Sequence, residues 1–453
     1  MRRMHILLVN NSNSRGGIPL MTCTLANAMA ERDHKVTIYN IKPVPSFFFP
    51  FYRLGYSLKR LSCPPGTVLL PPNSPHSLRD LYPLRPEVDV QIYNFTDNNL
   101  KVQALRQRIR ALAPDVCLPM FGDARQLVWA VTLLGSGVPY LYTERCAPKV
   151  VEGEFWSCKG RFAAMSGADR IHLLLEEYAE GLPDFLRDAV RIIANPAPEV
   201  RGQADTLARP GGRRRLLWLA RLDDNIKRCR LAITAFASIA KFHLDWDMHI
   251  VGDGADSALI RKHARDLKIE GRCQFHGETK EPLSHYLRAQ LYCISSRTEG
   301  FPNTLLEALA CGLPCVGFAS CSGVNSLIHD GENGLLAQED SVQALSIALS
   351  RLMADDDLRR TLGENALAVR QSFATSTIMD DWERLFAETA ACKGHTVMDA
   401  FTEEPFASMA RLSATARREY IFRDFGLPMP GSPLFYWISI KRMLGSLLKS
   451  ISD

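Results

Sequence analysis

The 453-residue sequence lacks several features from which a function is usually inferred. No run approaches the ~18 uninterrupted apolar residues of a membrane-spanning helix, so any membrane contact is expected to be peripheral. The 12 cysteines include no CxxC pair and have no histidines at zinc-finger spacing, which argues against a zinc site or a disulfide scaffold and favours reduced thiols in the cytosol. The basic start MRRMHILLVN leads into NNSNSRGG and not into a cleavage site, so it is interpreted as a first strand.

A large charge of either sign is also absent. The formal net charge is +5, which gives no case for nucleic acid binding. No Asp-x-Asp motif follows a strand in a setting that would hold Mg²⁺ or Mn²⁺, and Asp355 to Asp357 are expected to form a solvated turn between helices. Neither a metal nor another cofactor is therefore implied.

The sequence does contain a regular alternation of strands and helices. His5 to Val9, a glycine turn, a helix over 20–30 and a strand over 35–39 form a βαβ unit. A second series begins at Arg215 and includes the strand-like pieces LLWLARL, MHIVGDG, CQFHG and LYCIS. The Pro- and Gly-rich passage over 195–212 separates the two series, as a linker would. We therefore predict an α/β protein with two parallel sheets in series.

The most informative stretch is RTEGFPNTLLEALACGLPCVG at 297–317. Gly300, Pro302 and Asn303 predict a turn after an apolar strand, and Thr304 is expected to cap the helix that follows. The N-terminus of this helix would then point at whatever lies above the strand. Its unpaired N–H groups and partial positive charge suit a phosphate.

Glu299 and Glu307 flank this turn. Carboxylates beside a phosphate site suit hydroxyl groups, and a nucleotide-sugar presents phosphates and hydroxyls together. A carboxylate on the turn would contact the sugar, and one a helical turn further would reach the ribose. Two glutamates near a helix are more often simply solvated, but that alternative explains neither the GFPN turn nor the GLP turn after the helix.

At these residues the chain resembles the retaining glycosyltransferases of family 4, which carry a Glu-x7-Glu signature inside EGFPNxxLEAxAxGxPVV. The departures are conservative, such as Cys311 and Cys315 at small-residue positions. The resemblance implies the GT-B fold, with two Rossmann-like doubly wound domains facing across a cleft. It implies an acceptor-binding domain over 1–195, a nucleotide-sugar-binding domain over 196–392 with a crossover helix, and an extension over 393–453 with an amphipathic basic helix.

The resemblance also implies roles for individual residues. Glu299 would orient the sugar hydroxyls and stabilise charge, and Glu307 would bind ribose. The segment ARLDDNIKRC resembles the family's GRLxxxKG, so Arg221 and Lys227 are expected to grip the diphosphate and stabilise the leaving group. Backbone N–H groups of the turn would bind anions, which makes the turn residues donor-binding candidates: Gly300, Phe301, Pro302, Asn303, Thr304 and Leu305.

Two positions depart from GRLxxxKG. Ala220 stands where the family usually has glycine, and Arg228-Cys229 replaces another common glycine, so the local backbone is expected to differ slightly. A basic pair at a strand end is often only solvated surface, but its place one sheet unit before the glutamates favours binding. Fixed cations would remove the need for a metal. We predict that Lys227→Ala lowers kcat at least as strongly as it raises the donor KM.

Two weaker similarities lie in the first domain. GGIPLMTCTLANAMAERDHKVTIY resembles the family's opening, where a glycine loop lies near the donor phosphates, so Gly16 and Gly17 are donor-binding candidates; a tight strand-to-helix turn explains them equally well. The segment YTERCAP partly resembles SERNDP, which faces the interdomain cleft in the family. Glu144 and Arg145 are therefore candidates for donor-sugar or acceptor contacts, with a structural ion pair equally open.

The expected activity is transfer of a hexose or N-acetylhexosamine, from a UDP-sugar in preference to a GDP-sugar. The acceptor would be a glycan or glycolipid in polysaccharide or lipopolysaccharide biosynthesis. Retaining enzymes of this fold are generally thought to react on one face of the sugar, with the leaving phosphate oxygen helping to deprotonate the acceptor. The alternatives are a GT-B-fold nucleotide-sugar epimerase, which would interconvert free sugars without acceptor, and a non-catalytic carbohydrate-binding protein.

Two segments favour contact with a lipid surface. FFFPFYRLGYSLKRL at 47–61 combines aromatic residues with three cations, although a helix packed on the sheet explains it equally well. Residues 434–451 place apolar side chains near one helical face and cations elsewhere, as an interfacial helix does. The expected location is cytoplasmic, with peripheral contact at the inner face of the cytoplasmic membrane and a lipid-linked acceptor.

Overall fold

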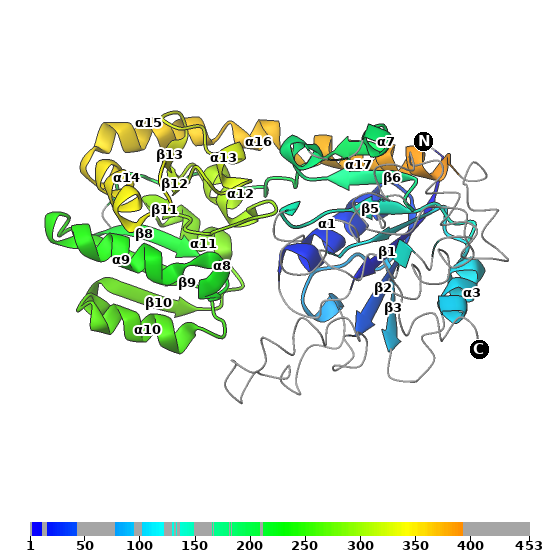
Figure 1. The fold of residues 1–453 in the computed structure, drawn as a ribbon, viewed down its shortest axis with the longest axis horizontal. Coiled ribbons are helices and arrows are strands. Elements are labelled where there is room, and N and C mark those ends of the chain that lie inside the picture. Colours follow the sequence, from blue (N-terminus) through cyan, green and yellow to red (C-terminus); the bar gives the residue numbers. More distant parts are fainter. Residues whose placement is uncertain are drawn as a thin grey trace, which may run out of the picture. The chain divides into compact units, whose positions relative to one another are not determined.

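Figure 1 shows a computed structural model of the chain, which describes residues 2–10, 16–42, 78–94, 102–121, 129–130, 133, 136–148, 165, 167–180, 182, 184–208 and 212–392. The chain forms two units: Met1–Ile193 with Met379–Asp453, called unit 1, and Ala194–Ile378, called unit 2. The two segments expected to contact a lipid surface, 47–61 and 434–451, lie outside the described residues. So does the predicted extension over 393–453.

Unit 1 contains two groups of parallel strands that are linked by a single bridge. Strands β1 (His5–Asn10), β2 (Lys35–Lys42), β3 (Asp89–Asn94) and β4 (Val116–Pro119) pair in the order β3-β2-β1-β4. Strands β5 (Leu141–Thr143), β6 (Arg170–Leu173) and β7 (Val190–Ile192) pair in the order β5-β6-β7, and a parallel bridge between Cys117 and Tyr140 links the two groups. β1 is buried at every position, as expected for a parallel strand covered on both faces.

The predicted βαβ unit is confirmed, with helix α1 between β1 and β2. The described helices of unit 1 are α1 (Gly17–Glu31), η1 (Leu78–Asp80), α3 (Val102–Leu112), η3 (Glu176–Ala179) and α7 (Asp184–Arg187). Met21, Leu25 and Met29 of α1 recur at helical spacing and are buried.

Unit 2 contains a six-stranded parallel sheet in the order β10-β9-β8-β11-β12-β13. Its strands are β8 (Arg214–Leu219), β9 (Trp246–Val251), β10 (Cys273–Gly277), β11 (Leu291–Cys293), β12 (Cys315–Phe318) and β13 (Gly334–Ala337). Counted from β8 as the first strand, this is the 3-2-1-4-5-6 order of a doubly wound Rossmann sheet. The expected second α/β sheet, beginning near Arg215, is therefore confirmed.

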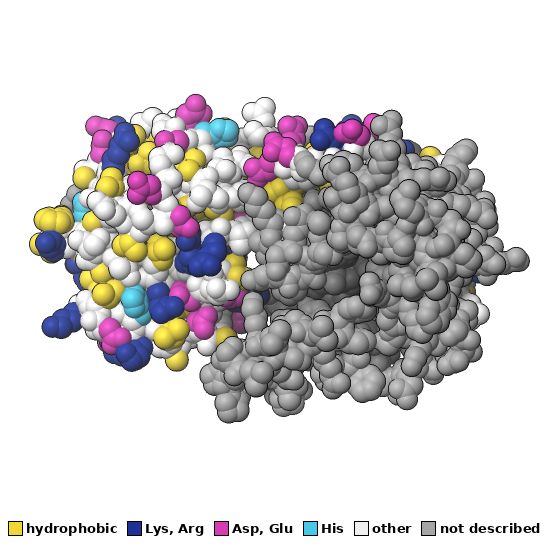
Figure 2. Space-filling view, in the orientation of Figure 1, with side chains coloured by type: hydrophobic (Ala, Val, Ile, Leu, Met, Phe, Trp, Pro, Cys, Tyr) yellow, Lys and Arg dark blue, Asp and Glu magenta, His cyan; other side chains and the backbone are white. Residues whose placement is uncertain are grey.

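Helices alternate with these strands. They are α8 (Asp224–Lys227), α9 (Cys229–Ile239), η5 (Ala240–Phe242), α10 (Ser257–Asp266), η6 (Glu270–Arg272), α11 (Pro282–Leu287), α12 (Asn303–Ala310), α13 (Val324–Leu327), α14 (Val342–Ala354), α15 (Asp356–Ala366) and α16 (Val369–Ser372). On the face of unit 2 visible in Figure 2, basic, acidic and apolar side chains are intermixed.

The last described helix, α17 (Thr375–Ala390), returns the chain to unit 1. Its Trp382 ring lies 4.4 Å from the ring of His172 in β6, and Glu383 Oε1 lies 3.1 Å from His34 Nε2. The sequence analysis assigned residues through 392 to the second domain, whereas the structure packs them from Met379 onward with the first. The apolar stripe that includes Trp382 and Phe386 predicts burial, but helical periodicity does not reveal against which sheet.

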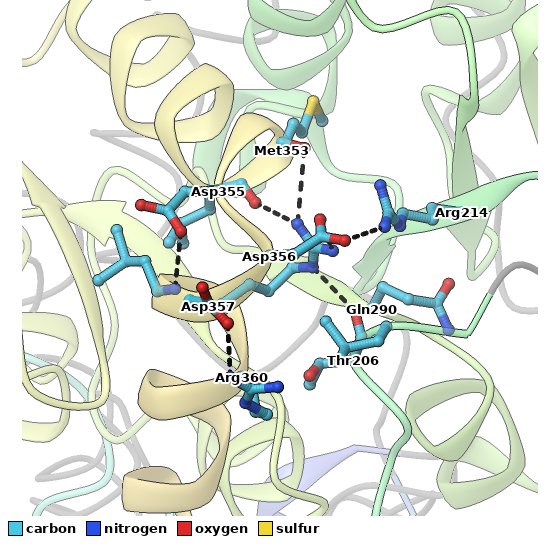
Figure 3. A network of polar contacts seen from close by, with 12 residues as sticks. Thr206, Arg214, Gln290, Met353, Asp355, Asp356, Asp357 and Arg360 are labelled. Atoms are coloured by element: carbon cyan, nitrogen blue, oxygen red, sulfur yellow. Dashed lines mark hydrogen bonds and ion pairs between the residues drawn. The ribbon is translucent and has the colours of Figure 1, made fainter.

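A buried arginine, Arg359, contacts both the linker and α15. It is fully buried; its Nε donates to the carbonyl of Thr206 at 2.8 Å, and its Nη2 lies 2.7 Å from Asp356 Oδ1. Figure 3 shows polar contacts of this region, with Thr206, Arg214 and Asp356 labelled. Asp356 also accepts a hydrogen bond from Arg214 Nη2 at 2.6 Å. This group of residues, Arg214, Asp356 and Arg359, is called the linker cluster below.

The expected turn at Asp355 to Asp357 joins α14 to α15, but its carboxylates are engaged by protein groups. Asp355 caps α15 by accepting from the backbone N–H of Leu358 at 2.9 Å, and Asp357 pairs with Arg360 at 2.5 Å. Asp355 and Asp357 are both exposed, so the expected solvated turn between helices is confirmed, with these contacts in addition. Among the described helices, none is both long and apolar enough to cross a membrane.

Candidate functional site

The candidate site lies where the order in which the chain adds strands to the unit 2 sheet reverses. β8 and β11 are neighbours, although the chain builds β9 and β10 on one side of β8 and β12 and β13 on the other. Connections leaving two such strands diverge and leave a crevice at their carboxyl ends, where ligands bind in open α/β sheets. The segments that follow the two strands are held together here, since the N–H of Arg297 donates to the carbonyl of Ile226 at 2.8 Å.

Lys227 and Glu299 form an ion pair at this position. Lys227 ends α8 and its Nζ lies 2.5 Å from Glu299 Oε1, with only 21% and 9% of the two side chains exposed. The sequence analysis assigned the lysine to the diphosphate and the glutamate to the sugar. The structure places them in contact with each other, so each offsets the charge of the other within a partly buried site.

Arg221 lies in the loop between β8 and α8 and is much more exposed. Its side chain is 67% exposed, and its Nη2 lies 3.3 Å from Asp223 Oδ2. Two glycines of the VGDG segment support this loop: a Cβ on Gly252 would lie 1.9 Å from the carbonyl oxygen of Ala220, and one on Gly254 would lie 2.5 Å from that of Leu222. The glycines therefore do more than form a turn, because only residues without a side chain allow this approach.

The turn before α12 differs from the prediction at its cap. The helix begins at Asn303 with Pro302 in the cap position, and no side chain caps it, so Thr304 lies inside the helix and is not its cap. The Asn303 N–H donates to the carbonyl of Phe301 and the Leu305 N–H to that of Pro302, both at 2.9 Å. An anion bound by these two N–H groups would have to replace those bonds.

Side chains from elsewhere in unit 2 fix this turn. Asn195, in the linker, donates through Nδ2 to Asn303 Oδ1 at 2.7 Å, and the Phe301 ring packs edge-on against Phe373 at 6.1 Å between centroids. The sequence analysis placed Asn195 at the start of the linker. Its contact with the start of α12 could not be read from the sequence, because 108 residues separate the two asparagines.

Glu307 lies on α12 and accepts a hydrogen bond from the hydroxyl of Tyr286 at 3.0 Å. Burial raises the pKa of Glu307 from 4.5 to about 7, while the Tyr286 hydrogen bond acts in the opposite direction. Tyr286 is fully buried on α11, with its ring 5.6 Å from that of Tyr292. The sequence analysis missed Tyr286, because a single tyrosine in the mixed segment EPLSHYLRAQ gives no signal of a contact with Glu307.

The remaining candidates belong to unit 1. Gly16 precedes α1 in extended backbone and its N–H donates to the hydroxyl of Tyr82 at 2.9 Å, and Gly17 begins the helix. Glu144 and Arg145 follow β5 and are both buried. Burial lowers the pKa of Arg145 to about 9, and its guanidinium lies 5.8 Å from the Trp382 ring.

The structure thus gathers one set of predicted site residues around the carboxyl ends of β8 and β11: Arg221, Lys227, Glu299, Gly300, Phe301, Pro302, Asn303, Thr304, Leu305 and Glu307. The donor contacts expected of Gly16, Gly17, Glu144 and Arg145 stay a prediction. An open hollow of about 470 Å³ lies beside α8, α9 and α10; Arg228 and Arg297 line it, whereas Lys227 and Glu299 do not.

Comparisons with known proteins agree with this geometry. Residues 202–369 match the family model described as glycosyl transferases group 1. An uncharacterized glycosyltransferase of Haemophilus influenzae is 23% identical over 83% of this chain and 97% of its own length. A Campylobacter jejuni protein named GalNAc-alpha-(1->4)-GalNAc-alpha-(1->3)-diNAcBac-PP-undecaprenol alpha-1,4-N-acetyl-D-galactosaminyltransferase is 23% identical over 85% of this chain and 99% of its own.

A solved structure shares the arrangement of strands and helices. Anabaena HepE, in complex with UDP and glucose, aligns with a TM-score of 0.62 and 17% identity, over 85% of this chain and all of its own. Likeness at this identity shows the fold, which is of the GT-B type. The match over 202–369 and the two relatives named as transferases support the group 1 glycosyltransferase superfamily and a transferase activity.

Proposed function

We propose that this protein is a retaining, metal-independent glycosyltransferase that transfers a hexose or N-acetylhexosamine from a nucleoside-diphosphate sugar, with UDP as the favoured nucleotide. The observation that carries the proposal is the Lys227–Glu299 pair at the carboxyl ends of β8 and β11. A cation and a carboxylate in contact at a nucleotide-binding crevice supply partners for a diphosphate and for sugar hydroxyls. The HepE complex, which contains UDP and glucose, supports this ligand class.

In the proposed reaction, the bond from the anomeric carbon to the diphosphate oxygen breaks while a bond to the acceptor oxygen forms on the same face. The acceptor proton moves to the departing phosphate oxygen. Lys227 and Arg221 offset the charge that develops on the leaving diphosphate. Glu299 accepts hydrogen bonds from the sugar hydroxyls once Lys227 contacts the diphosphate, and Glu307 accepts from the ribose.

The proposed acceptor is a glycan or a lipid-linked glycan, in polysaccharide or lipopolysaccharide assembly. The Campylobacter relative is named for an undecaprenol-linked acceptor, which supports this class. The proposed location is cytoplasmic, with a peripheral contact at the inner face of the membrane. The segments that carry the contact in this proposal, 47–61 and 434–451, lie outside the described residues.

The test is donor turnover by the purified protein without added metal. UDP- and GDP-sugars are supplied singly with a lipid extract, and nucleotide release is followed with and without the extract. We expect release from one donor that the extract stimulates and that Glu299→Ala abolishes. Glu364→Ala, which removes an exposed carboxylate on α15, serves as the matched control and should behave as the wild type.

Two results would contradict the proposal. Release of nucleotide from no donor, despite binding of UDP measured by calorimetry, would remove the transferase assignment. Interconversion of free sugars without acceptor would assign an epimerase. The anomeric configuration of the product, measured by NMR, tests retention separately.

A further inference from the structure

Arg228 adopts a backbone conformation that arginine rarely takes. It separates α8 from α9 and has φ 52° and ψ 47°, in the left-handed region. Residues with a Cβ are disfavoured there, because the Cβ approaches the neighbouring carbonyl oxygen. The similar family segment commonly has glycine at this step, which would adopt the conformation without strain. An arginine therefore occupies this position against its backbone preference.

The side chain of Arg228 links α8 to the segment after β11. It is 7% exposed, and its Nε donates to the carbonyl of Ser295 at 2.7 Å while Nη2 donates to that of Ser296 at 3.2 Å. Both acceptors lie just before Glu299 in the chain. The guanidinium thus fastens the end of the lysine-bearing helix to the start of the glutamate-bearing loop.

Ser295 holds the same two segments from the other side. Its hydroxyl lies 2.8 Å from the carbonyl of Lys227 and 3.0 Å from that of Arg228, and it accepts a hydrogen bond from Trp218 Nε1 at 2.9 Å. Trp218 belongs to β8, so the backbone on both sides of Arg228 is tied to β8 and β11. The left-handed backbone at Arg228 is therefore stabilised by hydrogen bonds that connect it, through Ser295, to Trp218 in β8.

The charge of Arg228 is balanced away from Lys227. Nη1 lies 2.5 Å from Asp340 Oδ1, and the guanidinium carbon lies 4.7 Å from the centroid of the Phe318 ring. A carboxylate and an aromatic face both stabilise a cation in a partly desolvated place. Without Asp340, the arginine and its neighbouring lysine would repel each other more strongly.

We infer that Arg228 is a positioning residue that sets the contact between Lys227 and Glu299, an inference that rests on the function proposed for that pair. Its backbone turns the chain so that Lys227 ends α8 beside Glu299. Its guanidinium fixes the distance between the two segments through Ser295 and Ser296. Arg228 replaces the flexibility of a glycine by a rigid cross-link between the parts of the site.

The test compares Arg228→Gly, Arg228→Lys and the wild type in donor turnover. Glycine keeps the left-handed backbone but removes the cross-link, so we expect kcat to fall at least tenfold and the donor KM to change less than threefold. Lysine keeps the charge and a single donor nitrogen, so Arg228→Lys should retain more of kcat than Arg228→Gly. Amide exchange of residues 295–300 without donor should be faster in Arg228→Gly, because the Arg297 N–H loses the support of the cross-link.

Lys268→Gly is the matched control. Lys268 is exposed and is also left-handed, with φ 54°, so its replacement by glycine relieves similar backbone strain without removing a buried network. It should leave kcat and amide exchange over 295–300 unchanged. Asp340→Asn provides a second variant if Arg228→Gly does not fold, and should lower kcat less than Arg228→Gly is expected to.

Wild-type kcat and wild-type amide exchange in Arg228→Gly would overturn the inference and leave Arg228 as a tolerated substitute for glycine. A fall in thermal stability with unchanged kcat would do the same, because it would indicate a structural role only. If the wild type turns over no donor, the proposed function fails. The exchange of residues 295–300 then still tests whether Arg228 positions the loop.

Discussion

Strand β8 of unit 2 has charged side chains grouped near each of its ends. The linker cluster includes Arg214, the first residue of β8, with Asp356 and Arg359. The site pair, Lys227 and Glu299, follows the carboxyl ends of β8 and β11. Burial alone does not distinguish the two, since Arg359 is fully buried and Glu299 is 9% exposed. Their position on the parallel sheet does, because ligands bind at the carboxyl ends of the strands.

The two clusters also differ in how their cations are occupied. The guanidinium of Arg359 donates to the carbonyls of Thr206 and Leu352 and to Asp356, contacts that no ligand is needed to complete. Lys227 instead contacts Glu299 through its ammonium group, and its side chain remains 21% exposed. Such a pair can exchange its partner for an incoming diphosphate. In a structural cluster the protein itself supplies all the hydrogen-bond partners of the charged groups. In a binding cluster a ligand can replace one of these partners.

The largest effect on stability is expected for Arg359→Leu. Removing the fully buried guanidinium takes a donor from the carbonyls of Thr206 and Leu352, and each buried group left unsatisfied costs about 1–3 kcal/mol in unfolding free energy. Chemical denaturation should show this loss, while the folded variant keeps the wild-type donor KM. The adjacent Arg360→Leu removes an exposed pair with Asp357 and should cost much less. Equal stability of both variants would break the contrast between the two clusters.

Lys227→Ala should mainly lower activity and have little effect on stability, in contrast to Arg359→Leu. Loss of a cation that stabilises a leaving group lowers kcat about 10²–10³-fold, so we expect a fall of this size with a smaller rise in donor KM. Thermal unfolding should change little by comparison with Arg359→Leu. The control is Lys262→Ala, which breaks an exposed pair with Asp266 at 2.6 Å and should leave both parameters unchanged. An unchanged kcat for Lys227→Ala would remove its role in the transition state.

The smallest effect is expected at Glu307, where it depends on pH. Burial raises the pKa of Glu307 to about 7, so the carboxylate that would accept from ribose is lost as the pH falls through that value. The donor KM should therefore rise several-fold toward pH 6. In Tyr286→Phe the pKa should rise further, since the hydrogen bond that lowers it is gone, and the inflection should move to higher pH.

The titration of Glu307 should also make the unfolding free energy of unit 2 depend on pH. The pKa of this group is higher in the folded chain than its ordinary value of 4.5, so the folded chain binds its proton more tightly. Its stabilising contribution is full below pH 4.5 and is lost as the pH rises through about 7. Glu307→Gln should remove both this dependence and the inflection in donor KM. If the inflection persists in Glu307→Gln, another group is responsible for it.

The sequence predicted a second parallel α/β sheet but not its strand order, and the family resemblance indicated Lys227 and Glu299 as site residues. Alternating apolar strands and helices indicate a parallel sheet, and the spacing of Arg221, Lys227 and Glu299 relative to those strands places them at carboxyl ends. These conclusions depend on local pattern along the chain. The structure confirms the α/β units and shows the pair in contact, at 2.5 Å.

Features that depend on distant residues could not be predicted. Tyr286 reaches Glu307 from another helix, and Asn195 reaches Asn303 across 108 residues, so no local spacing reveals either contact. The predicted cap at Thr304 was wrong because the cap position is two residues earlier, at Pro302, and the helix starts at Asn303. Proline restricts the backbone on its own, and the turn forms without a side-chain cap.

The return of the chain to unit 1 has a consequence for biosynthesis. Unit 2 is one continuous stretch, Ala194–Ile378, whereas unit 1 includes residues from both before and after it. On the ribosome, the sheet of unit 2 can be completed while unit 1 still lacks Trp382 and Phe386, two fully buried side chains of its core. The first unit to begin synthesis is therefore the last to be finished, and a truncation after Ile378 would leave unit 2 whole and unit 1 without part of its interior.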